Sequence, residues 1–339
     1  MKLTLALPGL TWLDHYDGAE VCKGLQLPTL QHLLGRARRT PQATSLSAMF
    51  GSLFGQPWQG LAALAAQQAN LDVGNGHWLI ADPVHVRIDR DRALLADIGV
   101  MALSQQEAEQ LTATLNQHFA DDGLYFVAPS PGRWFVQCQH ASQARFTPLV
   151  DAVGENVNDH LPQGEHGLEW SRLLNEMQML LYTHPVNDQR EARGELPVNS
   201  VWLWGEGDFT PPVTHYDRVL ADDADLHLLA ATSQAAVEAA PHAYTGLAEI
   251  LAEHPQEQNL LLVLDALQAP AQYRDAWGWR ETLTRLESDW FAPLQQALTR
   301  SQLTELTLHC HGPAGFKATL TPSLRWKFWQ RPIALAALY

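Results

Sequence analysis

The sequence predicts an α/β protein in which helices flank a mostly parallel sheet, with a smaller α+β domain inserted into it. Its short apolar runs are continuous rather than alternating, as strands covered on both faces require, and helical segments separate them. Such alternation of strands and helices favours parallel pairing with right-handed crossovers. The expected strands are 3–7, 201–204, 226–231, 260–264 and 303–308, and the expected helices are 27–38, 234–254 and 282–300.

Residues 77–136 have a different pattern, with shorter strand candidates and many turn residues. A helix is expected over 104–119, because Ser104 and Glu107 have the spacing of a capping box. Short strands are expected at 77–80, 84–88, 124–127 and 134–138. We therefore predict a core formed by residues 1–72 and 156–339, and an inserted α+β domain formed by residues 73–155.

The charge of the chain is acidic and evenly spread. Its 22 Lys and Arg residues against 37 Asp and Glu give a net charge of −15. Nucleic acids and anionic membranes bind clustered positive charge, so neither is expected as a partner. The basic stretches that exist, 36–39 and 325–331, are short.

The three cysteines, Cys22, Cys138 and Cys310, form no CxxC motif and no even-numbered framework, which is typical of a reducing compartment. Pro8 and Gly9 interrupt the first apolar run before it reaches the length of a signal peptide. No apolar segment approaches the ~20 residues of a membrane helix. A cytoplasmic protein is the expectation.

The segment 175–207 has an unusual density of hydrogen-bonding side chains between a helix and a buried strand. His184, Asn187, Arg190 and Asn199 bracket this strand, and ligands of α/β sheets bind where loops leave strand ends. The alternative is structural: the first two cap a helix, and Arg190 forms a solvated pair with Glu191. Trp202 and Trp204, with one residue between them, share a face of this strand. That face lies either in the core or along a binding groove.

A second candidate is the strand 82–89, where His85, Arg87 and Asp89 alternate with Val84, Val86 and Ile88. The period of two places the three polar residues on one face. A cation, an imidazole and a carboxylate so aligned can bind an acidic ligand, since arginine forms paired hydrogen bonds to carboxylates or phosphates. The alternative is a solvent-facing strand with a cross-strand ion pair.

Metal-ligating residue types occur at two places without a recognised ligand spacing. Asp159 and His160 lie in a segment rich in Pro and Gly that also reads as a surface loop, and His309 and His311 flank a strand end. The chain contains no GxGxxG or GxxxxGK phosphate loop and no GxSxG nucleophile elbow.

The segment HPVNDQREARGELPVNSVWLWGEG resembles a stretch of archaeal-type cofactor-independent phosphoglycerate mutases, in which HPVN, R, G, P and N precede WxWGxG. ADPVHVRIDRD resembles the DxxxRxN run that opens their inserted domain, with Asp89 in place of the usual asparagine. Together with NDHLP and RWKFWQRP, the whole chain is most similar to a bacterial offshoot, the RpfE-type regulatory proteins. The resemblance implies an alkaline-phosphatase-like α/β core with an inserted α+β domain.

The resemblance fails at the positions that carry the chemistry. Those mutases hold two divalent metals with Asp and His ligands and pass a phosphoryl group through a serine. Here Pro8 replaces the aspartate that ends the first strand, and no acidic residue follows the serine candidates, Ser45 and Ser47. The late acidic cluster is reduced to Asp265, and Cys310 with His311 takes the place of the terminal Asp-His pair. So few carboxylates disfavour a site for a hard divalent cation.

These observations predict a regulatory or binding relative of the mutases that has lost phosphoryl transfer and recognises a small anionic ligand or a protein partner. No cofactor is expected. The alternative is an active phosphomutase or phosphatase with a rearranged zinc or manganese site that draws on Asp159, His160, Asp265, His309 and His311. A structural protein whose aromatic surface packs against a second copy is a third possibility, so the oligomeric state is left open.

Overall fold

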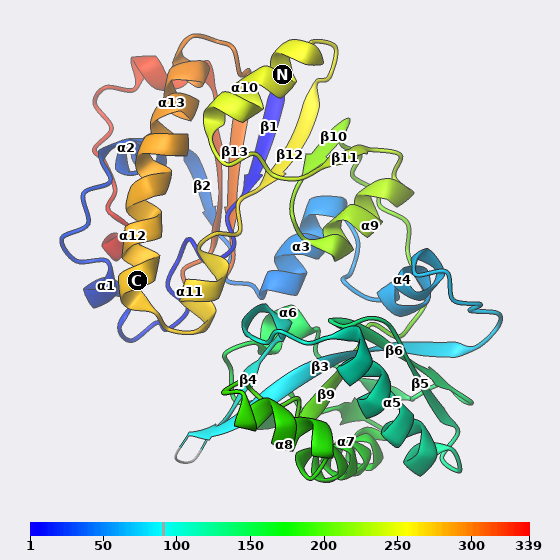
Figure 1. Cartoon of the computed structure of the whole chain (residues 1–339). Coiled ribbons are helices and arrows are strands. Elements are labelled where there is room, and N and C mark those ends of the chain that lie inside the picture. The colour runs from blue at the N-terminus through cyan, green and yellow to red at the C-terminus, as the bar shows by residue number, and fades with distance from the viewer. Residues whose placement is uncertain (90–91) are drawn as a thin grey trace. The chain divides into compact units, whose positions relative to one another are not determined.

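The computed structural model describes residues 1–89 and 92–339, so the last two residues of the ADPVHVRIDRD segment lie outside the described part. The chain forms two compact units, the first from Met1–Pro57 and Pro211–Tyr339 and the second from Trp58–Thr210 (Figure 1). These limits differ from the boundaries near 72 and 155 expected from the sequence. In the described part of the chain, no helix is both long and apolar enough to cross a membrane.

The first unit is built on a seven-stranded sheet with the order β11-β10-β12-β1-β13-β14-β2. The first five strands in this order are parallel, and β14 is antiparallel to both of its neighbours. The strands are β1 (Lys2–Ala6), β2 (Arg38–Pro41), β10 (Arg218–Leu220), β11 (Ala236–Glu238), β12 (Asn259–Val263), β13 (Glu305–Cys310) and β14 (Phe316–Leu320). The mostly parallel sheet predicted from the continuous apolar runs is confirmed.

Helices on this sheet bury the main core of the unit. Leu5, Leu262 and Leu308 on the three central strands pack in one cluster with leucines of α2, α12 and α13. Burying a leucine side chain stabilises the fold by about 1.5–3 kcal/mol relative to exposure. The helices are α1 (Gly18–Val21), α2 (Pro28–Arg36), α3 (Leu46–Phe54), α9 (Ala224–Thr232), α10 (Tyr244–Glu253), α11 (Gln268–Gln272), α12 (Ala276–Leu286) and α13 (Ala292–Thr299), with a π-helical turn at Glu287–Phe291 and 3-10 turns η4 (Pro322–Trp326) and η5 (Leu335–Leu338).

Two predictions about the first unit are wrong. Residues 226–231, expected as a strand, lie in α9, whose start is capped by the Asp223 carboxylate accepting from the Leu226 N–H at 2.9 Å. A short buried apolar run has no period that distinguishes a strand from a helix. The helix expected over 234–254 is confined to α10, and its first part forms β11 instead.

The second unit is an α+β fold around an antiparallel sheet. β3 pairs with β4, β6 and β9, and β5 pairs with β6. Its strands are β3 (His77–Asp89), β4 (Arg92–Ala96), β5 (Leu124–Ser130), β6 (Arg133–Cys138), β7 (Ala144–Arg145), β8 (Gln163–Gly164) and β9 (Ser200–Trp204). Its helices are α4 (Leu61–Gln68), α5 (Gln105–Phe119), α6 (Leu149–Ala152), α7 (Gly167–Tyr182) and α8 (Pro185–Ala192), with 3-10 turns η1 (Ile98–Val100) and η2 (Val157–His160).

The capping box predicted at Ser104 is confirmed, and α5 begins directly after it. Two other predictions are wrong. The strands expected at 77–80 and 84–88 are one strand, β3, which runs through Pro83 at a point where only β9 is paired with it. Residues 201–204, expected in the parallel sheet, form β9 and pair antiparallel with β3. Their apolar run identifies a buried strand but does not specify its partner.

Candidate functional site

The predicted polar turn is organised by His184 and Asn187. His184 caps α8: its Nδ1 accepts the Val186 N–H at 3.2 Å, and its Nε2 lies 3.0 Å from Thr114 Oγ1. Burial lowers the pKa of His184, although the negative charge of Asp188 acts in the opposite direction. Asn187 is buried and joins the end of α7 to the entry of β9, since its amide donates to the Leu181 and Val198 carbonyls and accepts from the Val198 N–H.

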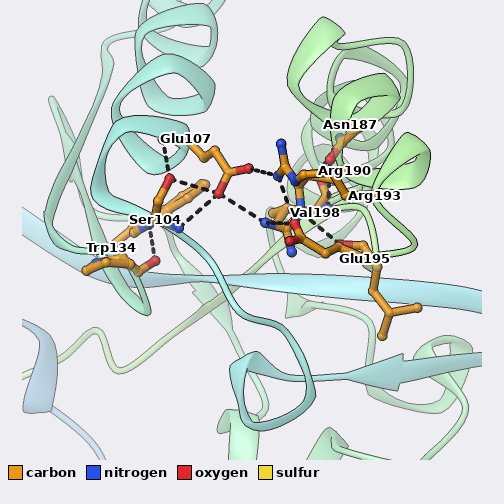
Figure 2. A network of polar contacts seen from close by, with 10 residues as sticks. Ser104, Glu107, Trp134, Asn187, Arg190, Arg193, Glu195 and Val198 are labelled. Carbon is orange, nitrogen blue, oxygen red and sulfur yellow. Dashed lines mark hydrogen bonds and ion pairs between the residues drawn. The ribbon is translucent and has the colours of Figure 1, made fainter.

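Arg190 is fully buried in a cluster of charged side chains that joins α5 to α8 (Figure 2). Its Nε donates to the Leu196 carbonyl at 2.9 Å, and its Nη1 lies 3.1 Å from Glu107 and 3.5 Å from Glu195. The solvated pair with Glu191 considered above is therefore wrong. One guanidinium nitrogen, Nη2, has no hydrogen-bond partner among the described residues.

Glu107 holds this cluster together because its carboxylate serves three residues at once. Its carboxylate accepts from the Ser104 backbone N–H and hydroxyl at 2.9 Å each, and its two oxygens contact Arg190 and Arg193. Burial alone would raise the pKa of Glu107, but the Ser104 and Arg193 hydrogen bonds and the charge of Arg190 together lower it. The carboxylate is thereby held ionised as the counter-charge of a buried arginine.

A second buried cluster surrounds the two tryptophans of β9. Trp204 Nε1 donates to Asp82 Oδ2 at 2.9 Å, and the other Asp82 oxygen is 3.0 Å from Arg133 Nε. The Arg133 guanidinium also lies 5.7 Å from the centroid of the Trp204 ring. Trp202 Nε1 donates to the Thr147 carbonyl at 2.8 Å. Both indoles are buried, so their polar atoms are used within the unit.

Asn199 and the polar strand 85–89 lie next to each other. The Asn199 amide accepts from the Val86 N–H at 2.8 Å and donates to the Val86 carbonyl at 2.9 Å. His85 Nδ1 lies 2.9 Å from the Pro197 carbonyl. Arg87 and Asp89 are exposed near the end of β3, where Arg92 stands opposite Asp89 in the register. These two exposed side chains are the part of the predicted ligand face that is open to solvent.

In the first unit, several predicted site residues meet at the carboxyl edge of the parallel sheet. The Gly9 N–H, next to Pro8, lies 3.4 Å from His311 Nδ1, and Gly9 packs so closely on the Leu267 carbonyl that a Cβ would lie 2.4 Å from its oxygen. The loops after β1, β12 and β13 are therefore in contact. Gly9 adopts φ +74°, a conformation that favours glycine.

The two serine candidates lie at the start of α3, beside the same edge. Ser45 is the N-cap of α3, accepting from the Ala48 N–H at 3.2 Å, and its hydroxyl is 3.1 Å from that of Ser47. The preceding residue, Thr44, pairs with Gly312 directly after His311. The two serines thus lie close to the residue that follows His311, and Ser45 Oγ serves as a helix cap.

The side chains at this edge do not fit the two-metal centre that the resemblance implies. Pro8 offers no donor atom. Burial lowers the pKa values of His309 and His311 to about 4, aided at His309 by Lys317, so both imidazoles are neutral, but two imidazoles do not make a two-metal centre. Burial, followed by the charge of Asp222, raises the pKa of Asp265. Asp159 and His160 belong to η2 of the second unit. Within residues 1–89 and 92–339, no three His, Cys, Asp or Glu side chains are grouped to hold a metal ion.

Sequence reasoning missed the partners of the buried charges. Glu107 was identified only as half of a capping box, and Asp82, Arg133 and Arg193 were not singled out. Arg193 lies three residues after Arg190, a spacing that places two cations on neighbouring turns of one helix. No sequence signal connects them to Glu107, which is 83 residues from Arg190.

The capping box allows a local test of this cluster. Ser104→Ala removes the cap of α5 and one hydrogen bond to Glu107, and we expect it to lower the free energy of unfolding by about 1 kcal/mol. Urea unfolding followed by circular dichroism measures this. Ser171→Ala is the control, because the Ser171 hydroxyl donates to the Gly167 carbonyl within its own helix, α7. Equal losses in the two variants would contradict a specific role for Ser104.

Comparisons with known proteins agree with this architecture. Residues 43–187 match the family of 2,3-bisphosphoglycerate-independent phosphoglycerate mutases. The enzyme of that name from Methanosarcina mazei is 30% identical over 146 residues, which is 42% of this chain and 36% of that protein. The enzyme of that name from Methanosarcina barkeri is 27% identical over 236 residues, covering 64% and 58%. The matched parts thus span between about a third and three-fifths of these relatives.

The fold extends beyond the matched sequence. The structure of the PH0037 protein from Pyrococcus horikoshii superposes with a TM-score of 0.53 at 14% identity, covering 99% of this chain and 91% of that one. At this identity the likeness concerns the fold alone. Both comparisons agree with an alkaline-phosphatase-like α/β scaffold, and the sequence matches make the chain a relative of the cofactor-independent phosphoglycerate mutases.

Proposed function

We propose that this protein is a binding or regulatory relative of the cofactor-independent phosphoglycerate mutases, of the RpfE type, without phosphoryl-transfer activity. The single observation that carries the proposal is Pro8 at the carboxyl end of the central strand β1, where the resemblance calls for a metal-ligating aspartate. Proline has no side-chain donor. The neighbouring His311 nitrogen, which would otherwise be a ligand, faces the Gly9 N–H.

The distribution of the sequence match supports the same proposal. The match to the mutase family covers residues 43–187 and so includes the serine region and most of the second unit. Pro8, Asp265, His309 and His311 all lie outside it. The matched range thus contains the exposed ligand candidates Arg87 and Asp89, and none of these four residues of the implied metal site.

The proposed ligand surface is the exposed end of β3 in the second unit. Arg87 offers a guanidinium to a small anion or to an acidic group of a protein partner, and His85 is half-buried beside it. The buried residues Asn187, Arg190 and Asn199 contribute by fixing the turn that supports this strand. Trp202 and Trp204 anchor the strand next to it.

Arg87→Gln tests the ligand surface. We expect 3-phosphoglycerate to cause a change in NMR chemical shifts at the end of β3, and expect Arg87→Gln to weaken this binding about tenfold by removing a charge-assisted pair. Arg172→Gln, which removes another exposed arginine of the same unit, should bind like the parent protein. Equal binding by both variants would exclude Arg87 as the anion-recognising residue.

An active phosphomutase or phosphatase is the second candidate, and the names of the matched relatives favour it. In that case a zinc or manganese site would draw on Asp265, His309 and His311, and Ser45 or Ser47 would be the nucleophile. The metal would activate the nucleophile and stabilise charge on the phosphoryl oxygens.

Metal content and turnover decide between the two candidates. For protein purified without chelator, we expect substoichiometric zinc and manganese and no conversion of 3-phosphoglycerate to 2-phosphoglycerate when either metal is added. The matched variants are Ser45→Ala, Ser47→Ala and Ser52→Ala, the last on the same helix but hydrogen-bonded to the Met49 carbonyl. Stoichiometric metal, with turnover lost in Ser45→Ala or Ser47→Ala and kept in Ser52→Ala, would refute our proposal.

A further inference from the structure

The outer part of the first unit's sheet has one polar face. In the antiparallel register of β13, β14 and β2, Lys317 stands opposite Thr40 and Thr319 stands opposite Arg38. Because side chains alternate along a strand, these four residues share a face. The intervening residues of β14 point the other way and are buried in the core cluster: Phe316, Ala318 and Leu320.

This polar face borders a pocket of about 470 Å³ with an unusual lining. Three cations, Arg38, Lys317 and Lys327, contribute to it, together with threonine hydroxyls and one carboxylate, Glu305. Hydroxyl groups and cations in this combination provide donors for an anion with several oxygens. The single carboxylate leaves the lining positive in a chain whose net charge is −15.

The fold forms this cluster from two basic stretches that lie far apart in the sequence. Lys327 Nζ donates to the Arg36 carbonyl at 3.0 Å, 291 residues away. Gly35 packs on the Arg331 carbonyl, where a Cβ would lie 2.2 Å from the oxygen. The stretches 36–39 and 325–331 are each too short to attract a polyanion, which is why the sequence predicts no membrane partner. Together they form one basic surface beside β2, whose position is marked in Figure 1.

The cations of the pocket are available for an external anion. In the part of the chain that the structure describes, Arg38, Lys317 and Lys327 form no ion pair with a carboxylate, whereas the buried Arg218 contacts both Glu238 and Glu257. Basic residues on an edge strand also prevent edge-to-edge aggregation, which is the simpler explanation for Arg38. That explanation does not account for the pocket or for the side chains next to it.

Three large aromatic side chains belong to the same segment of the chain as Lys327. Trp326, Phe328 and Trp329 flank Lys327 and are 64%, 77% and 66% exposed. Phe328 and Trp329 form an edge-to-face pair with centroids 5.3 Å apart, and Arg325 covers Trp326 at 5.1 Å. Exposed aromatic groups beside cations are typical of segments that enter the interface of a membrane.

We propose that the basic pocket and the adjacent aromatic residues form a peripheral binding surface for anionic phospholipid, in addition to the proposed function above. Arg38, Lys317 and Lys327 bind the headgroup phosphate, and Phe328 and Trp329 enter the headgroup region. A single-stranded nucleic acid is the weaker fit, because base stacking requires open ring faces. Here the two rings meet edge to face, and a guanidinium covers the third.

Co-sedimentation of the full-length chain with vesicles tests this proposal. We expect binding to phosphatidylcholine vesicles that contain phosphatidylserine, little binding to pure phosphatidylcholine, and loss of binding at high salt. Arg38→Gln/Lys317→Gln should weaken binding about thirty-fold, since each basic residue near the membrane surface contributes roughly fivefold. The matched control is Lys2→Gln/Lys23→Gln, which removes two exposed lysines of the same unit.

The aromatic contribution has its own pair of variants. Trp329→Ser should weaken vesicle binding several-fold, and Trp277→Ser, which removes a tryptophan that is 76% exposed on α12, should not. The replaced side chains are exposed, so all variants are expected to fold. Circular dichroism verifies this.

Three results would overturn the proposal. The first is the absence of binding to phosphatidylserine vesicles at low salt, and the second is equal binding by the Arg38/Lys317 and Lys2/Lys23 variants. The third is saturable binding of inorganic phosphate or of a single-stranded oligonucleotide at this surface without vesicle binding, which would identify a soluble anion as the ligand. None of these measurements depends on phosphoglycerate binding or turnover, so this proposal and the proposed function can fail separately.

Discussion

Arg190→Met is expected to destabilise the protein by about 3 kcal/mol, because Arg190 is fully buried and pairs with Glu107 at the centre of the second unit. The substitution leaves the Leu196 carbonyl without its donor and removes one of the two cations that hold the Glu107 carboxylate. The methionine side chain is unbranched and apolar and fills most of the same volume, so most of the loss reflects polar groups left without partners. Urea unfolding followed by circular dichroism gives the free energy.

Arg193→Gln is the matched control for this experiment. Arg193 contacts the same Glu107 carboxylate, but its side chain is 47% exposed. Exposed ion pairs contribute at most about 1 kcal/mol, so Arg193→Gln should cost less than Arg190→Met by a factor of three or more. Similar losses would mean that the cluster stabilises the unit through surface charge and not through the buried guanidinium.

The free energy of unfolding is expected to fall by several kcal/mol as the pH decreases from about 6.5 towards 4. Burial lowers the pKa values of His309 and His311 from 6.5 to about 4 in the folded protein. Above pH 6.5 both imidazoles are neutral in either state, so they have no effect. Below it the unfolded chain binds protons that the folded chain excludes, which favours unfolding until the folded groups titrate near pH 4.

Urea unfolding between about pH 4.5 and 7.5, roughly the range in which histidine titrates, measures this dependence. His311→Asn should flatten the curve, because an amide keeps an acceptor for the Gly9 N–H and does not titrate in this range. The exposed His140 supplies the control, His140→Asn, which should leave the slope unchanged. An unchanged slope in His311→Asn would show that other groups cause the acid sensitivity.

The success of the sequence predictions depended on whether a signal was local. The capping box at Ser104 and Glu107 involves residues three apart, so the start of α5 was predictable. The strand identity of 201–204 followed from its apolar run, yet its pairing with β3 did not, because any strand buried on both faces has such a run. The failure at 226–231 has the same origin, since a six-residue run of mostly apolar residues has no distinctive period.

In the candidate sites, too, local features were predictable from the sequence and contacts between distant residues were not. The replacement of a metal-ligating position by Pro8 is visible in the sequence, since proline lacks a donor in any fold. That Arg190 is a buried cation paired with Glu107, and not a solvated partner of Glu191, depends on the packing of α5 against α8.

By itself, the sequence determined the α/β class, the capped helix α5, the relationship to the mutases and the missing donor at Pro8. The tertiary structure decided which charges are buried, which strand belongs to which sheet, and that the stretches 36–39 and 325–331 form one basic surface. The physical reason is that helix caps and side-chain periodicity act over a few residues. Ion pairs and strand pairing act through space, between residues whose separation along the chain carries no signal.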